Sequence, residues 1–331
     1  MAIHIRRREF IATLGSAAAW PLMARAQRPA IPVVAVISGQ SENADARNTA
    51  AFRKGLTETG YVDGQNVTVD YHWLDGQYDR LPALTADLVR RQVALIATTG
   101  SVPAALAAKA ATATIPIVFA VGGDPVKLGL VASIPRPGGN ATGINNFLNE
   151  LTAKRLRLLH DLLPNATRVA VLVNPANAAS TDTTLQGVQE AAPAIGLQTN
   201  ILKATTVGEI DAVFAGFARE RPDALFVAGD ALFASRAIQF VTLTAHDRIP
   251  ASYSLRDYVI AGGLMSYGSD LAEMAHQVGI YSGNVLKGSK PADLPVLQTN
   301  KFNLAINLQT ARALGIDVPS GVLSIVDEVV E

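Results

Sequence analysis

Apolar and polar residues follow one another along this chain in two repeating patterns. Short runs rich in Val and Ile predict buried strands, and longer segments with apolar residues at helical spacing predict helices. In the first part of the chain the expected strands are Ile31–Ser38, Val67–Trp73, Val93–Thr98 and Ile115–Val121, and the expected helices are Ala46–Thr59, Leu81–Arg91 and Pro103–Thr112. Strands that alternate with helices in this way predict βαβ units and a parallel sheet.

The same order starts again after a segment rich in Gly and Pro. Val126–Ser133 predicts a short helix, and Pro135, Pro137, Gly138 and Gly139 predict a crossover after it. The later strands are expected at Arg168–Val173, Gln198–Leu202, Ala224–Val227, Ile249–Tyr253, Gly263–Tyr267 and Asn303–Ile306, and the later helices at Leu151–Leu163, Thr181–Ile195, Ile210–Glu220, Ser235–His246, Leu271–Leu286 and Leu308–Leu314. The acidic pair Asp327-Glu328 is expected in a solvated tail.

Two such units in series predict an α/β fold with two Rossmann-like, doubly wound lobes and a ligand cleft between them. We expect lobe 1 to hold residues 27–146 with about 263–288, and lobe 2 to hold about 147–262 with 289–331. The chain has 331 residues, of which 49% are hydrophobic and 17% charged, which is enough material for two cores.

The N-terminus resembles an export signal. Arg6, Arg7 and Arg8 precede an apolar run, Ala12–Met23, and Ala24-Arg25-Ala26 has the form of a cleavage site. Arg7-Arg8 followed by Phe10-Ile11 is similar to the twin-arginine motif. The apolar run is about a dozen residues, shorter than the ~20 that span a bilayer. We therefore expect residues 1–26 to be a twin-arginine signal peptide, cleaved after about Ala26, and the protein to reach the periplasm.

Composition and missing motifs argue against several enzyme classes. The chain has no cysteine, so it has no thiolate nucleophile, thiolate metal site or lipobox. The first strand is followed by Ser38-Gly39-Gln40-Ser41, which lacks the glycine fingerprint of dinucleotide sites, and no phosphate-binding loop or nucleophile elbow is found. The five histidines are scattered, and the formal net charge is zero, without a basic stripe. We expect no catalytic residues, no metal, no cofactor and no nucleic-acid partner.

Small polar residues at the predicted strand ends favour a binding function, because open α/β sheets bind ligands there. Backbone amides and hydroxyls at helix N-termini suit a carboxylate. Asp124 and Asp230 could accept hydrogen bonds from an ammonium group, and Tyr253 and Tyr267 could cover an apolar body. The candidate ligand-binding residues are Ser38, Gln40, Ser41, Thr99, Gly100, Ser101, Gly122, Asp124, Asn174, Asn177, Asp230 and Tyr253. For any one of them, helix capping is an equally good interpretation.

Several segments resemble one family, the periplasmic substrate-binding proteins of ABC transporters in the TrpX-like group. The similar segments are Gly122–Val126, Gly129–Val131, Arg136–Gly143, Lys154–Leu156, Leu162–Pro164, Arg168–Pro175, Gly283–Gly288, Asn303–Asn307, Ala311, Leu314-Gly315, Pro319 and Val326–Val329. The resemblance implies a type I periplasmic-binding-protein fold whose lobes are joined by three crossovers, near 144–148, 250–263 and 288–300. It implies no covalent chemistry.

The resemblance also implies a ligand and a partner. Members bind amino acids, notably aromatic ones, or related organic acids, and their closed lobes dock on an inner-membrane permease. We expect a monomer that binds a small molecule in the cleft, where Arg256-Asp257 could favour an acid over a zwitterion. A solute receptor for a signalling partner has the same sequence features, and a nucleotide-dependent enzyme on a Rossmann-like fold is a weaker alternative.

Overall fold

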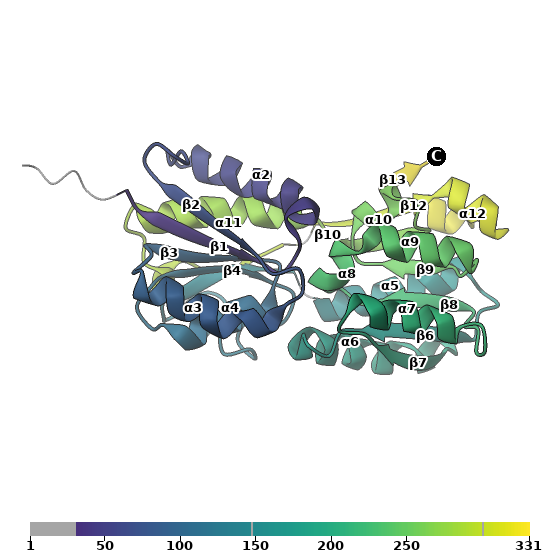
Figure 1. Cartoon of the computed structure of the whole chain (residues 1–331). Coiled ribbons are helices and arrows are strands. Elements are labelled where there is room, and N and C mark those ends of the chain that lie inside the picture. The colour runs from purple at the N-terminus through teal and green to yellow at the C-terminus, as the bar shows by residue number, and fades with distance from the viewer. Residues whose placement is uncertain (1–30, 147, 300) are drawn as a thin grey trace, which may run out of the picture.

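The fold consists of two lobes that lie side by side, each built on one sheet (Figure 1). It is seen in a computed structural model, which describes residues 31–146, 148–299 and 301–331. The expected signal peptide, residues 1–26, lies outside the described residues. Within the described part of the chain, no helix is long and apolar enough to cross a membrane.

Lobe 1 is built on a parallel sheet with the strand order β11-β5-β4-β3-β1-β2. Its strands are β1 (Val33–Ser38), β2 (Thr68–Trp73), β3 (Leu95–Thr99), β4 (Ile117–Val121), β5 (Ala141–Asn145) and β11 (Leu297–Gln298). Its helices are α2 (Glu42–Glu58), η1 (Tyr78–Arg80), α3 (Leu81–Arg90), α4 (Val102–Ala111), α11 (Leu271–Leu286) and η3 (Pro291–Asp293).

Alternation along β1 shows how the sheet buries both faces. Val34 and Val36 pack in the apolar cluster under α2 and α11, whereas Ala35 and Ile37 pack in the cluster under α3 and α4. Because successive side chains of a strand point to opposite faces, a strand covered on both sides is a continuous apolar run. This explains why β1 is readable from the sequence.

Helix α11 comes late in the chain but packs on α2 in lobe 1 (Figure 1). Glycines allow the two helices to approach closely. A Cβ at Gly279 would lie 2.2 Å from the carbonyl oxygen of Phe52, and one at Gly55 would lie 2.1 Å from that of His276. No larger residue fits at either position without a shift of the helix backbone.

Lobe 2 is built on a sheet with the order β13-β12-β10-β9-β8-β6-β7, in which only the β10–β12 pair is antiparallel among the described strands. Its strands are β6 (Arg168–Val173), β7 (Gln198–Lys203), β8 (Ala224–Val227), β9 (Ala251–Tyr253), β10 (Met265–Ser269), β12 (Phe302–Asn307) and β13 (Glu328–Val330). Its helices are α5 (Leu148–Leu162), α6 (Ala178–Ala191), η2 (Pro193–Ile195), α7 (Val207–Gly216), α8 (Ala231–Ser235), α9 (Ala237–His246), α10 (Arg256–Ile260), α12 (Leu308–Leu314) and α13 (Ser320–Leu323).

Three local expectations are wrong. Residues 126–133 form turns instead of a helix, and Gly129 there has φ +73°, a left-handed conformation that interrupts a helix. No strand was expected directly after the crossover at residues 135–139, but β5 (Ala141–Asn145) lies there as a full member of the first sheet. The acidic pair is solvent-accessible as expected, but it is bound to lobe 2 instead of lying in a tail: Asp327 Oδ2 accepts a hydrogen bond from Leu304 N at 2.7 Å, and Glu328 pairs with Arg256.

The sheets also place the crossovers differently from the sequence. The chain leaves lobe 1 after β5, near residues 145–148, which lies within the expected 144–148. It returns between β10 and α11, near 269–271, instead of 250–263, because β10 pairs with β9 and β12 in lobe 2. The last crossover joins β11 to β12 near 298–302, since β11 pairs with β5 in lobe 1. The strand within 263–288 thus belongs to lobe 2, and β11 to lobe 1.

Candidate functional site

The strand order of each sheet places a candidate binding site at the interface of the lobes. The order reverses between β1 and β3 in lobe 1 and between β6 and β8 in lobe 2. Ligands of open α/β sheets bind at such switch points, at the carboxyl ends of the strands. The loops after these four strands carry Gln40, Gly100, Asn177 and Asp230, and all four residues line one pocket.

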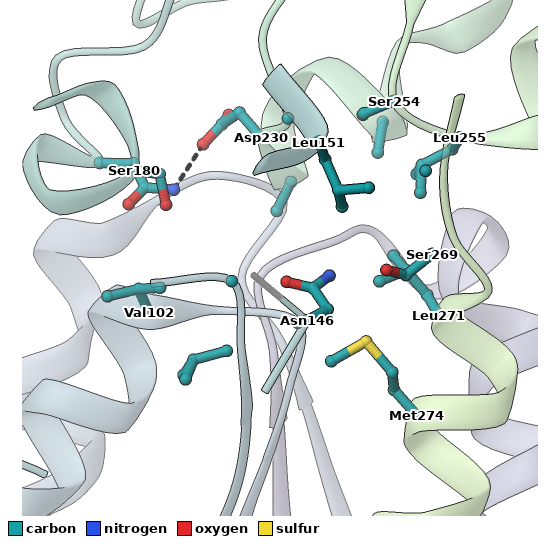
Figure 2. A pocket seen from close by; sticks show the side chains of 18 of the residues that line it. Val102, Asn146, Leu151, Ser180, Asp230, Ser254, Leu255, Ser269, Leu271 and Met274 are labelled. Carbon is teal, nitrogen blue, oxygen red and sulfur yellow. Dashed lines mark hydrogen bonds between the residues drawn. The ribbon is translucent and has the colours of Figure 1, made fainter. Parts of the chain in front are cut away.

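This pocket holds about 790 Å³ of space that is not filled by atoms, part of it open to solvent. Apolar side chains form much of its wall, and Figure 2 shows Val102, Leu151, Leu271 and Met274 around the central Asn146. The lining residues are Gln40, Gly100, Val102, Val121, Gly122, Asn146, Leu151, Thr152, Arg155, Asn177, Ser180, Gly229, Asp230, Ala231, Ala234, Ser254, Leu255, Tyr267, Gly268, Ser269, Leu271 and Met274. Across residues 31–146, 148–299 and 301–331, no group of three His, Asp or Glu side chains could hold a metal ion.

Arg155 on α5 is a buried cation in the pocket wall. The residue is 4% exposed, and its guanidinium carbon lies 3.8 Å from the centre of the Phe226 ring. One Nη donates to the carbonyl oxygen of Val227 at 2.7 Å, but Nε has no hydrogen-bond partner. None of the carboxylates that the structure describes forms an ion pair with it.

Burial therefore leaves Arg155 in an unfavourable state without a ligand. Burial lowers the pKa of Arg155 to about 9, because removal from water disfavours the charged form. A buried charge without a counter-ion costs several kcal/mol, so an anionic ligand group would recover free energy here. The planar guanidinium matches a carboxylate, which it can bind with two parallel hydrogen bonds.

Asp230 is the negatively charged residue of the same wall (Figure 2), and it lies at the N-cap of α8. Its Oδ1 accepts from Leu232 N at 2.9 Å and from Asn174 Nδ2 at 2.8 Å. Its Oδ2 accepts from Asn177 Nδ2 at 3.0 Å and from Tyr78 Oη at 3.2 Å. Burial, and then the charge of Asp230, raises the pKa of Tyr78, so its hydroxyl stays protonated and donates.

Tyr78 belongs to lobe 1, and its bond to Asp230 is one of three side-chain contacts that join the lobes beside the pocket among the residues that the structure describes. Ser41 N donates to Ser235 Oγ at 2.9 Å, and Arg236 pairs with Asp75 at 2.7 Å. We call these six residues, Ser41, Asp75, Tyr78, Asp230, Ser235 and Arg236, the clasp. Because the clasp spans both lobes, the structure shows the closed arrangement.

Two glycines of lobe 1 make the close approach of the clasp possible. A Cβ at Gly39 would lie 2.7 Å from Cβ of Ala231, and one at Gly76 would lie 2.7 Å from Cβ of Leu232. Both distances are too short for real side chains, so α8 can dock on lobe 1 only against these glycines. Gly76 also has φ +78°, which favours glycine in its own right.

Comparison with known proteins agrees with this geometry. Residues 30–330 match the family model described as ABC transporter substrate binding protein. The chain belongs to this family. A curated relative, the Tyrosine-binding protein of Clostridioides difficile (strain R20291), is 28% identical over 263 residues, which are 80% of this chain and 75% of the relative.

Solved structures of similar proteins show the same fold. An ABC domain from Streptococcus pneumonia in complex with L-Trp is 27% identical, with a TM-score of 0.81 over 90% of this chain and 99% of the other. A conserved domain protein from Vibrio cholerae is 26% identical, with a TM-score of 0.82 and the same coverage. The expected two-lobed type I periplasmic-binding-protein fold is thereby confirmed for this ABC substrate-binding protein.

Five of the residues chosen from the sequence lie in the pocket wall. Gln40, Gly100, Gly122, Asn177 and Asp230 come together there from the two lobes. Tyr267, considered as an apolar cover, also lies in the wall.

The other seven lie outside the wall. Ser38 Oγ accepts from Gln40 N at 3.2 Å, Ser41 belongs to the clasp, and Ser101 caps α4 through Ala104 N. Thr99 is buried behind Gly100. Of these four residues, only Ser101 fits the capping interpretation, because Ser41 makes no side-chain cap bond to α2 and Thr99 Oγ1 has no hydrogen-bond partner.

Asp124, Asn174 and Tyr253 were expected to contact the ligand, but they do not line the pocket, each for a physical reason. Asp124 is exposed, and its Oδ1 caps the turn by accepting from Val126 N at 2.9 Å. Asn174 donates to Asp230 behind the wall. The Tyr253 ring is buried in the core of lobe 2, stacked on Tyr258 with centroids 4.4 Å apart, because the alternation of β9 turns it away from the cleft.

Arg155 was missed by the sequence analysis, although the helix pattern contains a signal for it. Its position is four residues after Leu151 and four before Leu159, so it falls on the apolar stripe of α5. A charged residue on the buried stripe of an otherwise amphipathic helix indicates a functional group or an ion pair.

Arg256 and Asp257 do not line this pocket. They line a neighbouring cavity with Arg47, Asp270 and Glu328, and Arg256 pairs there with Glu328. The expectation that Arg256-Asp257 reaches the ligand cleft is therefore wrong.

Proposed function

We propose that this protein is exported to the periplasm, binds a small carboxylate-bearing solute between its lobes, and delivers it to the permease of an ABC importer. The solute is an amino acid or a related organic acid. The observation that carries this proposal is Arg155, a buried guanidinium in the pocket wall that forms no ion pair with any described carboxylate, Asp230 of the same wall included.

The pocket surface supports a solute with a charged end and an apolar body. Arg155 provides the site for the carboxylate, and Val102, Val121, Leu151, Leu271 and Met274 provide an apolar wall. The relatives that bind tyrosine and L-Trp carry this combination in their ligands. An aromatic or a large aliphatic side chain is therefore the expected body of the solute.

Closure follows from the same contacts. A solute on Arg155 is partly covered by lobe 2 alone, and the loops at Gln40, Gly100 and Gly122 complete the wall only when lobe 1 closes. The ligand then shifts the open–closed equilibrium by its higher affinity for the closed form. Opening at the permease releases the solute.

The proposal is tested by thermal unfolding with paired compounds that differ only in charge. We expect tyrosine, tryptophan or leucine to raise the melting temperature by a few degrees at 100 times the dissociation constant, because bound ligand adds about 2.7 kcal/mol. The matching amides, which lack the carboxylate, should give no shift at the same concentration. Equal shifts from acids and amides would contradict the carboxylate assignment.

The transport step needs a cellular readout. Cells that lack the protein should lose uptake of the radiolabelled compound that binds, and the wild-type gene should restore it. If the wild-type gene restores binding of the compound in periplasmic extracts but uptake is the same with and without the gene, a signalling receptor is favoured over an importer subunit.

A further inference from the structure

The four hydrogen bonds of Asp230 fill its acceptor positions in the closed form. A carboxylate offers about four lone-pair directions, and here Leu232 N, two asparagine amides and the Tyr78 hydroxyl occupy them at 2.8 to 3.2 Å. Asp230 therefore has no free position for the ammonium group of a ligand. The sequence had suggested that Asp230 accepts a hydrogen bond from such an ammonium group directly.

Asp230 instead fixes the amide of Asn177. Because Asn177 Nδ2 donates to Asp230, the orientation of the amide is fixed and its Oδ1 is left to accept from another group. Asn177 is 5% exposed and lines the pocket, and its Oδ1 is buried without a hydrogen-bond partner. A buried acceptor without a partner is unfavourable, so this oxygen is poised to accept from a ligand.

Lobe 1 contributes a second acceptor of the same kind. Asn146 follows β5 and points into the pocket (Figure 2), and its Oδ1 is also buried without a partner. Among the described residues of the wall, the buried polar atoms without a partner are thus Nε of the cation Arg155, the amide oxygens of Asn146 and Asn177, and the hydroxyl oxygen of Ser269.

We propose that Asn177 selects the ligand by accepting a hydrogen bond from an amino or hydroxyl group near its carboxylate, and that Asp230 is a positioning residue that acts through Asn177. This inference rests on the proposed function and refines it. A neutral acceptor binds an N–H or an O–H donor, whereas a carboxylate acceptor strongly favours an ammonium group. The substrate class is therefore 2-amino and 2-hydroxy acids together, and acids without either group are excluded.

Titration calorimetry on the wild-type protein tests the class. The compounds are tyrosine, tryptophan and leucine, the analogues in which a hydroxyl replaces the amino group at C2, and the unsubstituted acids in which a hydrogen replaces it. In the series that binds, we expect the hydroxy acid to bind within about tenfold of the amino acid and the unsubstituted acid to bind at least about tenfold more weakly. A hydroxy acid that binds more than tenfold more weakly, or an unsubstituted acid that binds as well as the amino acid, overturns the inference.

These outcomes separate the two proposals. If all three kinds of acid bind equally, the selection by Asn177 fails and the carboxylate-binding function stands. If no acid binds at all, both fail.

Variants test the roles of the two residues. Asn177→Ala should reduce the preference for the amino acid over the unsubstituted acid to less than about threefold. Asn174→Ala is the matched control, because Asn174 donates to the same carboxylate from outside the pocket; it should keep the preference even if affinity falls.

Asp230→Asn distinguishes positioning from direct contact. It should weaken amino and hydroxy acids by the same factor. A loss confined to the amino acid would show that Asp230 contacts the ammonium group directly. Because the wild-type series alone decides the inference on substrate class, a variant that fails to fold does not remove that test.

Discussion

The two lobes contribute different chemistry to one pocket. Lobe 2 supplies both charged groups of the wall, Arg155 and Asp230, together with Asn177. Lobe 1 supplies glycines, apolar side chains and two amides, Gln40 and Asn146, and none of its described lining residues is charged.

This difference assigns the lobes different tasks. A charged ligand gains most of its electrostatic stabilisation from lobe 2, which can therefore hold it in the open form. Lobe 1 excludes water and adds the clasp when it closes. We expect substitutions in lobe 2 to change capture and substitutions in lobe 1 to change closure.

The largest effect should come from removing the cation of lobe 2. Arg155→Met keeps much of the buried volume but removes the carboxylate partner, and we expect affinity to fall about 100-fold or more, since buried charged hydrogen bonds contribute about 3 kcal/mol. Gln40→Ala in lobe 1 should cost less than about tenfold. Calorimetry measures both, and a larger loss for Gln40→Ala would contradict the division of tasks.

The next effect should come from blocking closure at Gly39. Gly39→Val places a side chain where Ala231 docks, 2.7 Å from its Cβ, so the lobes cannot close fully. We expect affinity to fall about tenfold through faster dissociation, with little change in the melting temperature of the free protein. Gly208→Val is the control, because a Cβ at Gly208 has no atom within 4 Å. A large loss of unliganded stability would instead show that Gly39 serves the fold.

A smaller effect is expected from the ion pair of the clasp. Asp75 and Arg236 are each about 30% exposed, so water screens their attraction. Asp75→Asn should weaken binding about two- to fivefold at low salt, and 0.5 M salt should reduce the difference between variant and wild type. Asp87→Asn removes two ion pairs within lobe 1, with Arg90 and Arg91, and should leave affinity unchanged. Equal effects of the two variants would argue against an ion pair that acts through closure.

The smallest effect near neutral pH should come from titration of Arg155. Because burial lowers its pKa to about 9, the guanidinium is charged at pH 7 and loses its proton as pH rises through about 9. Affinity for a 2-hydroxy acid, which carries no titrating amine, should be constant from pH 6 to 8 and fall above about 9. Calorimetry over this range checks it, and a decline already between pH 6 and 8 would point to another group.

The sequence predicts most strands, including the edge strands β2 and β7, and misses β5, β11 and β13. β1 and β4 are continuous apolar runs, because helices cover both sides of the sheet. β5 reads Ala-Thr-Gly-Ile-Asn and lacks that pattern, and it needs Gly143 because a Cβ there would lie 2.0 Å from the carbonyl oxygen of Phe119. β11 and β13 have two and three residues, too few for a periodicity to show.

The site is less predictable, because whether a residue lines the pocket depends on the direction of its side chain as well as on its position in the chain. Gln40 and Asp230 follow strands at the switch points, so topology alone indicates them. Tyr253 ends a strand just as plausibly, yet the alternation of β9 buries its ring in the core. Arg155 enters from a helix that no strand-end rule covers. The saturation of Asp230 depends on Tyr78, which is 152 residues away in the chain.

The most direct test of the account is small-angle X-ray scattering of the wild-type protein and Arg155→Met, each with and without the amino acid that gives the largest thermal shift. We predict that ligand lowers the radius of gyration of the wild-type protein, because the lobes close on a solute held by lobe 2. The variant should stay unchanged at the same ligand concentration. Equal compaction of the two proteins would contradict the claim that Arg155 captures the ligand that closes the lobes.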